Sequence, residues 1–421
     1  MTSTNIRLTR SLFFILALTF GPLIVRASIS LQNQGLGQDI KKVAESISDV
    51  EVRVRLESAL KQVELTGRSL KVQGVARNFT RVSNRPQPQE KLKISNVRIA
   101  NKNFWKVDHF EGASQNSELL SEPILKVEGL EIVSAGKALP SKIFLALDKA
   151  AIDLVGVLPL ERYLVGVLAS EMPLRWPEES LKAQAVAARS YSLAVMKEKK
   201  SQLFQLESSV KDQVFRHVSN GIDHDPLIQR AFDAVKATEG QILTNKKSQV
   251  FKAFYHADCG GATSSAKAVW GFGDASPGAI DPSCPGNPSA TWSLQLSQRA
   301  LTDKLAKILK LSTSEVLVAS LSPKALSHGL RAEAVEVTLT NGQRQILLAD
   351  SFRSKVGYSS LKSTQFEVQK NESQYGTEFV FQGRGFGHGV GLCQWGSRQL
   401  AAEHKTYREI LKHYYPQAEL R

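Results

Sequence analysis

The chain of 421 residues carries 54 lysines and arginines against 40 aspartates and glutamates, which gives a formal net charge of +14. Its length and its 42% apolar content are enough for a sizeable core, and two or three structural units are expected. The charge favours polyanionic partners: nucleic acid, an anionic lipid surface or a wall polymer. The presence of only three cysteines excludes a disulfide-dense scaffold.

The N-terminus indicates export. Arg7 and Arg10 precede an apolar run from Leu12 to Val25, and Ala27 follows with the small side chain that a signal peptidase reads. The run is too short for a comfortable transmembrane helix, so we interpret residues 1–27 as a cleaved signal peptide, with an uncleaved anchor as the alternative. No second long apolar stretch follows, so no membrane span is expected after cleavage. Export argues against a nucleic-acid partner and directs the positive charge toward the cell envelope.

The next part of the chain predicts a small N-terminal module. Residues 36–47 show a weak helical pattern, and Val50–Leu56 alternates between apolar and polar residues as a half-buried strand does. The polar, proline-bearing stretch 83–90 is interpreted as a linker. We therefore expect a module of unknown role at 28–90, a strand-rich lead-in at 91–144 and a main domain at 145–421.

The main domain mixes strands and helices without regular alternation, which predicts an α+β fold. A strand pair is expected around the tight turn Asp148-Lys149, and the following helix-period stretches predict helices. The expected strands are 142–147, 150–157, 250–255, 334–340, 345–348 and 378–383, and the expected helices are 160–168, 178–197, 226–237, 298–310 and 407–414.

Glu171 is the first candidate for chemistry. We expect it on a connection between two helices, beside the apolar Met172 and Pro173 and near Trp176. Apolar surroundings raise the pKa of a carboxyl group, and a carboxyl group that keeps its proton can act as a general acid. A solvated loop glutamate or a helix cap is the alternative.

A second candidate region surrounds Cys259, which precedes two glycines. His256 lies three residues earlier, and on an extended strand this spacing directs the two side chains to opposite faces, which argues against a thiol protease. Imidazole and thiolate are suitable zinc ligands, so His256, Cys259 and Cys284 form a candidate metal site. A Cys259–Cys284 disulfide and free thiols are the alternatives.

The third region, Gly383–Gly396, has glycine at every second position up to Gly391. In an extended chain one face would carry no side chains, while Arg384 and His388 would lie on the other. A bare face allows close approach of a ligand or another backbone. The phosphate-loop and dinucleotide patterns do not fit these glycine spacings. His388 is a candidate for substrate or metal binding, and a tight strand packed under a helix is the alternative.

In these regions the chain resembles the SpoIID/LytB family, named for stage II sporulation protein D and the amidase enhancer. The resemblance covers roughly residues 145–415. It rests on four sequence motifs that follow one another in the same order as in the family: LERYLVGVLASEMP, WPEESLKAQAVAARSYSLA, YHADCGGATS with VWG, and GRGFGHGVGLCQWG. The family often has Ser or Ala where Cys393 stands, and commonly Thr where Ser190 stands.

The resemblance implies a peptidoglycan-active domain, and it matches the family's catalytic glutamate to Glu171. Members resembling stage II sporulation protein D are lytic transglycosylases that act on glycan strands stripped of stem peptides, usually beside an amidase, with no required cofactor. Some relatives bind zinc through histidine and cysteine. The candidate substrate contacts are Arg384, His388, Gln394 and Arg189. The alternative function is a non-catalytic amidase enhancer, and a general envelope role is as compatible with the sequence as a role in sporulation.

Overall fold

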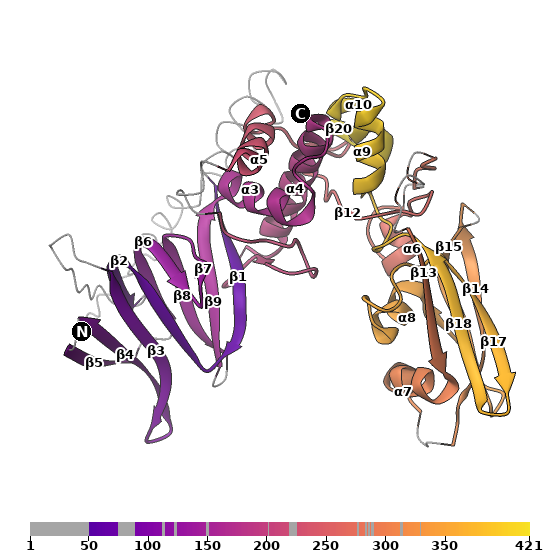
Figure 1. Cartoon of the computed structure of the whole chain (residues 1–421), viewed down its shortest axis with the longest axis horizontal. Helices are drawn as coiled ribbons and strands as arrows, with labels where there is room; N and C mark the ends of the chain where they lie inside the picture. The colour runs from indigo at the N-terminus through magenta and orange to yellow at the C-terminus, as the bar shows by residue number, and fades with distance from the viewer. Residues whose placement is uncertain are drawn as a thin grey trace, which may run out of the picture.

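The computed structural model describes residues 50–74, 89–111, 114–121, 124–148, 151–200, 202–218, 225–275, 278–282, 284, 287, 290–311, 315–328 and 330–421. The predicted signal peptide, the helical pattern at 36–47 and most of the predicted linker lie outside these residues. Within the described ranges, no helix is long and apolar enough to cross a bilayer. Figure 1 shows a large sheet at one end of the molecule, helices in the middle and two smaller sheets at the other end.

The large sheet has ten strands in the order β10-β1-β9-β8-β6-β2-β3-β4-β5, with β7 paired to β6. Alternation along its strands buries one face, where Val63, Leu65 and Ile94 are at most 2% exposed. Its strands are β1 (Glu51–Leu60), β2 (Gln62–Gly74), β3 (Glu90–Ile99), β4 (Lys102–Glu111), β5 (Ser114–Leu120), β6 (Ile124–Ser134), β7 (Lys137–Ala138), β8 (Lys142–Asp148), β9 (Ala151–Pro159) and β10 (Leu206–Glu207).

This sheet corrects the predicted boundaries. Strands β2 and β3 flank the predicted linker, yet they pair in antiparallel register with Thr66 opposite Lys91. Strand β1 pairs with β9, and the predicted boundary at 144/145 falls inside β8. The described part of the expected N-terminal module is therefore built into one sheet with the start of the main domain. Polar composition identified a connection but carried no information on which strands pair across it.

Three helices follow the sheet: α3 (Leu160–Glu171), α4 (Glu178–Glu198) and α5 (Pro226–Ala237). Helix α4 carries a face of small side chains on which Ala183 and Ala187 are fully buried. This thin face packs beneath the C-terminal helices α9 (Gln394–Ala402) and α10 (Tyr407–Tyr414), which share a core with it. Thr406 and Glu409 close the start of α10 with a capping box.

The other end of the molecule contains two three-stranded sheets with the orders β13-β18-β17 and β14-β15-β16. Their shared core includes the packed rings of Phe352, Phe366 and Phe381. The elements of this C-terminal unit are β13 (Thr291–Ser297), α7 (Gln298–Leu309), β14 (Val318–Ser327), β15 (Arg331–Leu339), β16 (Arg344–Leu348), α8 (Ala349–Val356), β17 (Phe366–Ser373) and β18 (Gly376–Arg384).

Short elements join the helical middle to the C-terminal unit. Strand β12 (Tyr255–His256) pairs in parallel with β19 (Leu392–Cys393), which places His256 opposite Cys393 and brings the second and third motif regions together. Helix α6 (Ala266–Trp270) lies between these regions in the sequence, and β11 (Leu243–Thr244) pairs with β20 (Glu419–Leu420).

The α+β prediction is confirmed, and α5 and α10 have the predicted bounds. The predicted strand at 250–255 is wrong, because only Tyr255 and His256 form a strand and Val250 makes a single bridge to Thr244. Helix α3 also extends three residues beyond the predicted end at 168, so Glu171 is its last residue rather than part of a connection. The chain turns at Pro173, which cannot continue the helix.

Candidate functional site

Glu171 is half-buried at the C-terminal end of α3. The backbone N–H of Val214 donates a hydrogen bond to its Oε1 at 2.6 Å, which fixes one oxygen of the carboxyl group. Burial raises the pKa of Glu171, while the Val214 N–H and the Gln394 side chain act in the opposite direction. The carboxyl group therefore has the raised pKa that the sequence predicted, in a setting with one anchored oxygen.

Close packing against α3 positions the segment that anchors Glu171. A side chain at Gly166 would collide with the Arg216 carbonyl group and the Phe215 ring. Phe215 packs against Tyr163 with 4.8 Å between ring centroids. Because Gly166 permits this approach, residues 214–216 lie directly over the helix and Val214 reaches the carboxylate.

Two tyrosines, the buried Tyr163 and the half-buried Tyr255, lie on the inner side of the site. The hydroxyl groups of Tyr163 and Tyr255 have no hydrogen-bond partner within the described part of the chain. Burial raises the pKa of Tyr255 well above its usual range, and the charge of Glu171 is the next cause. The inner wall beside the carboxyl group is therefore aromatic and uncharged.

Gln394 connects the glycine-rich region to Glu171. It is the first residue of α9 and only 4% exposed, and its side-chain amide is one of the groups that lower the pKa of Glu171. Of the four predicted substrate contacts, Gln394 is the one whose side chain itself shifts the pKa of Glu171.

Sequence reasoning missed an aromatic pair beside this junction. Trp176 follows α3 and Trp395 follows Gln394, and their ring centroids are 5.0 Å apart in an edge-to-face arrangement. The guanidinium group of Arg398 lies 5.3 Å from the Trp395 ring and 5.9 Å from the Trp176 ring. All three side chains are partly exposed. Both tryptophans lie within the motifs that carry the resemblance, and this position is the signal that could have identified them.

The glycine-rich segment corrects the extended geometry predicted for it. Gly385, Gly387, Gly389 and Gly391 have φ values of +81°, +115°, +80° and +71°, so alternate residues adopt conformations that L side chains rarely reach. The predicted close approach does occur, because a Cβ at Gly389 would lie 2.6 Å from the Arg331 guanidinium group. The glycines therefore form a tight loop around buried groups, without the bare strand face that we expected.

His388 and Arg384 lie in different surroundings. His388 is partly buried among aromatic rings, 5.1 Å from Trp270 and 5.5 Å from His256 between centroids, and burial lowers its pKa to about 3. Arg384 is exposed at the end of β18, where it lines a cavity of about 890 Å³ in the C-terminal unit. The lining of that cavity includes Trp292 and Gln365 but none of Glu171, His388 or Gln394.

Arg189 requires a correction. It is fully buried, and its guanidinium group forms an ion pair with Glu161 (Nη2–Oε2, 2.6 Å) and hydrogen bonds with the carbonyl oxygens of Gln241 and Val235. No part of the side chain is accessible to a glycan. We therefore assign Arg189 to the framework that joins α3 and α4 rather than to the substrate contacts.

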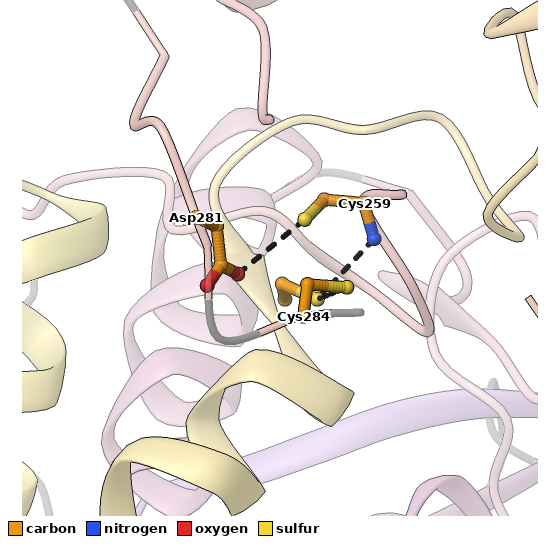
Figure 2. Close-up of side chains that lie close together, drawn as sticks. Cys259, Asp281 and Cys284 are labelled. Carbon is orange, nitrogen blue, oxygen red and sulfur yellow. Dashed lines mark hydrogen bonds between the residues drawn. The ribbon is translucent and has the colours of Figure 1, made fainter. Parts of the chain in front are cut away.

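The three cysteines form a buried cluster of free thiols, which was the third alternative, and the cluster differs in composition from the predicted metal site. All three are free, so the structure contains no Cys259–Cys284 bridge. Ligand atoms of Cys259, Asp281, Cys284 and Cys393 all lie within 4.8 Å of one another, and His256 is not part of this set. Figure 2 shows Cys259, Asp281 and Cys284 directed toward one another. Three thiols and a carboxylate suit a thiophilic divalent ion such as zinc.

Two family models match this chain. The model described as stage II sporulation protein matches residues 148–245, which include Glu171 and Val214, and a model for a domain of unknown function matches residues 285–391. Stage II sporulation protein D of Bacillus subtilis is 30% identical over 319 residues, which cover 72% of this chain and 85% of that protein. The chain belongs to the SpoIID/LytB family.

Two further relatives show how far the similarity reaches. An uncharacterised protein of Brachyspira hyodysenteriae is 32% identical over 263 residues, or 62% of this chain and 66% of that protein, slightly less than two thirds of its length. The amidase enhancer of Bacillus subtilis is 27% identical over 297 residues, or 60% of this chain and 39% of the enhancer. The four residues of the thiol cluster lie outside both family-model matches of this SpoIID/LytB member.

Proposed function

We propose that this SpoIID/LytB member is an exported lytic transglycosylase that cleaves peptidoglycan glycan strands with Glu171 as its single general acid and base. Glu171 protonates the glycosidic oxygen between N-acetylmuramic acid and N-acetylglucosamine. It then accepts a proton while the muramyl C6 hydroxyl group bonds to the anomeric carbon. The observation that carries the proposal is the raised pKa of a half-buried carboxyl group with one oxygen anchored by a backbone N–H.

The other carboxylates of the motif regions support a single-acid mechanism. An ordinary glycosidase places two carboxyl groups about 5 to 9.5 Å apart across the scissile bond. Asp258 is fully buried and accepts hydrogen bonds from Asn287 and the Gly260 N–H, while Glu161 binds Arg189. Among the residues that the structure describes, no carboxylate shifts the pKa of Glu171.

The simplest nucleophile is then the muramyl C6 hydroxyl group of the substrate itself. Intramolecular attack gains the large effective concentration of a tethered group, which replaces the second protein carboxylate and its activated water. The expected product ends in a 1,6-anhydro-muramyl residue, and the bond changes balance without any added reagent.

The aromatic pair and Arg398 supply a binding surface for this substrate. Trp176 and Trp395 offer partly exposed rings that bind the apolar faces of sugar rings. A muramyl residue stripped of its stem peptide carries a free lactyl carboxylate, and the Arg398 guanidinium group beside both rings is suited to bind it. Gln394 contributes an amide close to the scissile oxygen.

The alternative function is a non-catalytic amidase enhancer, and the similarity to a relative of that name favours it as the second candidate. In that case the same surface binds glycan and a separate cell-wall amidase performs the cleavage. The high positive charge suits attachment to an anionic wall in both cases.

One experiment separates the two functions. Purified protein and its Glu171→Gln variant are incubated with intact sacculi and with amidase-treated glycan, with and without an added cell-wall amidase, and soluble products are measured. The transglycosylase proposal predicts release from amidase-treated glycan by the wild type alone and none by the variant. Release that requires the amidase and is equal for both proteins would establish the enhancer function instead.

A further inference from the structure

The cluster of Cys259, Asp281, Cys284 and Cys393 has the composition and spacing of a metal-binding site. The Sγ atoms of Cys284 and Cys393 are 3.5 Å apart, and the Cys259 Sγ lies 3.4 Å from Asp281 Oδ2. A tetrahedral zinc ion with Zn–S bonds of about 2.3 Å separates neighbouring sulfurs by about 3.8 Å. The four side chains therefore need only small adjustments to surround one ion.

Asp281 provides an independent indication of a ligand. The residue is fully buried, and its Oδ2 accepts a hydrogen bond from the Tyr414 hydroxyl group at 2.6 Å. Its Oδ1 is buried with no hydrogen-bond partner among the residues that the structure describes. An unsatisfied carboxylate oxygen is costly in a protein interior, and a bound cation would satisfy it.

The surroundings of the sulfurs match those of metal-bound thiolates. Backbone N–H groups of Cys259 and Gly396 are directed to the Cys393 Sγ at 3.2 and 3.3 Å, and the Gly261 N–H is directed to the Cys259 Sγ at 3.3 Å. Such donors stabilise negative charge on sulfur and orient the ligands. The buried Arg331 guanidinium group donates to the Cys259 carbonyl oxygen and adds a positive charge next to the cluster.

We propose that Cys259, Asp281, Cys284 and Cys393 bind one zinc ion as a closed structural site. The site takes no part in the bond changes of the proposed reaction. Its ligands differ from the predicted set, because Asp281 and Cys393 replace His256. All four side chains are at most 1% exposed and leave no position open to water, as in structural rather than catalytic zinc sites. The His256 Nδ1 instead lies 3.2 Å from the Val390 carbonyl oxygen.

The consequence of this site is to join three distant segments beside the candidate active site. Cys259 lies in the connection after β12, Asp281 and Cys284 lie before β13, and Cys393 ends β19. The Cys393 Sγ also caps α9, whose first residue is Gln394. Zinc bound here fixes the start of α9, and thereby holds Gln394 next to Glu171.

The test is a metal count on the purified full chain. The protein is reduced, loaded with zinc, dialysed against metal-free buffer and measured by inductively coupled plasma mass spectrometry. One zinc per chain is expected, and replacement by cobalt should give the intense visible spectrum of a tetrahedral, thiolate-bound ion. The proposal would be overturned if the protein held less than about a tenth of an equivalent of zinc and all three thiols reacted with an alkylating reagent. It would also be overturned if the protein lacked zinc and peptide mapping found a Cys284–Cys393 disulfide.

Variants identify the ligands. Cys393→Ser and Asp281→Asn should lose the cobalt thiolate spectrum or change it, whereas His256→Gln, the matched control from the predicted set, should keep one zinc. Tyr414→Phe removes only the hydrogen bond to Asp281 and should weaken zinc binding about tenfold to hundredfold. If Cys393→Ser does not fold, amide hydrogen exchange of the wild-type protein takes the place of that variant. Removal of zinc should then accelerate exchange in residues 390–400. Zinc retained by every ligand variant, or exchange unaffected by zinc removal, would contradict the assignment.

Discussion

Replacement of Arg189 by methionine tests whether this residue belongs to the framework or to the substrate site. Methionine preserves much of the aliphatic volume but removes the ion pair with Glu161 and the hydrogen bonds to the carbonyl oxygens of Gln241 and Val235. Arg189 is fully buried, and Glu161 is left as a carboxylate without its counter-ion. Breaking a buried pair from one side costs about 3–5 kcal/mol, so a loss of this size in the free energy of unfolding is expected.

The assay is guanidinium denaturation followed by far-ultraviolet circular dichroism, which reports on the helices and strands of the whole chain, α3 and α4 among them. The matched control is Arg68→Met, because Arg68 pairs with Glu131 on the exposed surface of the sheet, where loss of an ion pair costs about 0–1 kcal/mol. A Glu161→Gln/Arg189→Met double variant should recover part of the stability, since no unpaired carboxylate remains. An Arg189→Met protein of normal stability with a raised KM for glycan would refute the framework assignment.

Three further predictions concern Glu171, the aromatic pair and the glycine-rich loop. Burial raises the pKa of Glu171, and the general acid must be protonated, so kcat should fall as the pH rises through that pKa. The stability of the wild type relative to Glu171→Gln should also decline as the pH rises above the ordinary pKa of a glutamate. Melting curves of both proteins at acid and neutral pH measure this decline. Trp395→Ala should raise KM for amidase-treated glycan about tenfold and leave kcat within about threefold of the wild-type value. The control Tyr375→Ala, at an exposed hairpin tip, should change neither constant. A decrease in kcat alone would exclude a binding role for Trp395. Gly389→Ala should destabilise the protein by about 2–4 kcal/mol in chemical denaturation, because a Cβ there meets the Arg331 guanidinium group. The control is Gly342→Ala, where φ is similar but the surroundings are open, and it should cost about 1–2 kcal/mol. Equal costs for the two variants would show that the close approach at Gly389 is unimportant.

Local sequence patterns predicted the elements of the main domain better than their assembly. Helix α5 has the predicted bounds because Asp225 caps it and Pro226 occupies its first position, both of which are local signals. The predicted boundary at residue 90 was wrong because strand pairing across a connection is a long-range property. Periodicity also could not show that Gly385–Gly391 alternates into the left-handed region, since extended and looped chains share the same spacing.

The candidate site was predictable where a single residue carried the signal. The apolar neighbours of Glu171 indicated the raised pKa that the fold provides, but they did not indicate Tyr255 and Val214, which border the carboxyl group and are distant from it in the sequence. Arg189 was misassigned because sequence alone does not show that Glu161 lies opposite it across two helices. Asp281 carried no motif, and only the fold brings it to the cysteines.

The most direct test of the central claim is the chemistry of the newly formed chain ends. Amidase-treated glycan is digested with the wild-type protein and with Glu171→Gln, and the soluble fragments are analysed by mass spectrometry. The single-acid mechanism predicts fragments that end in 1,6-anhydro-muramyl residues for the wild type and none for the variant. Fragments heavier by one water, with reducing ends from the first minutes of digestion, would contradict it, because water would then be the nucleophile and a second carboxyl group would have to activate it.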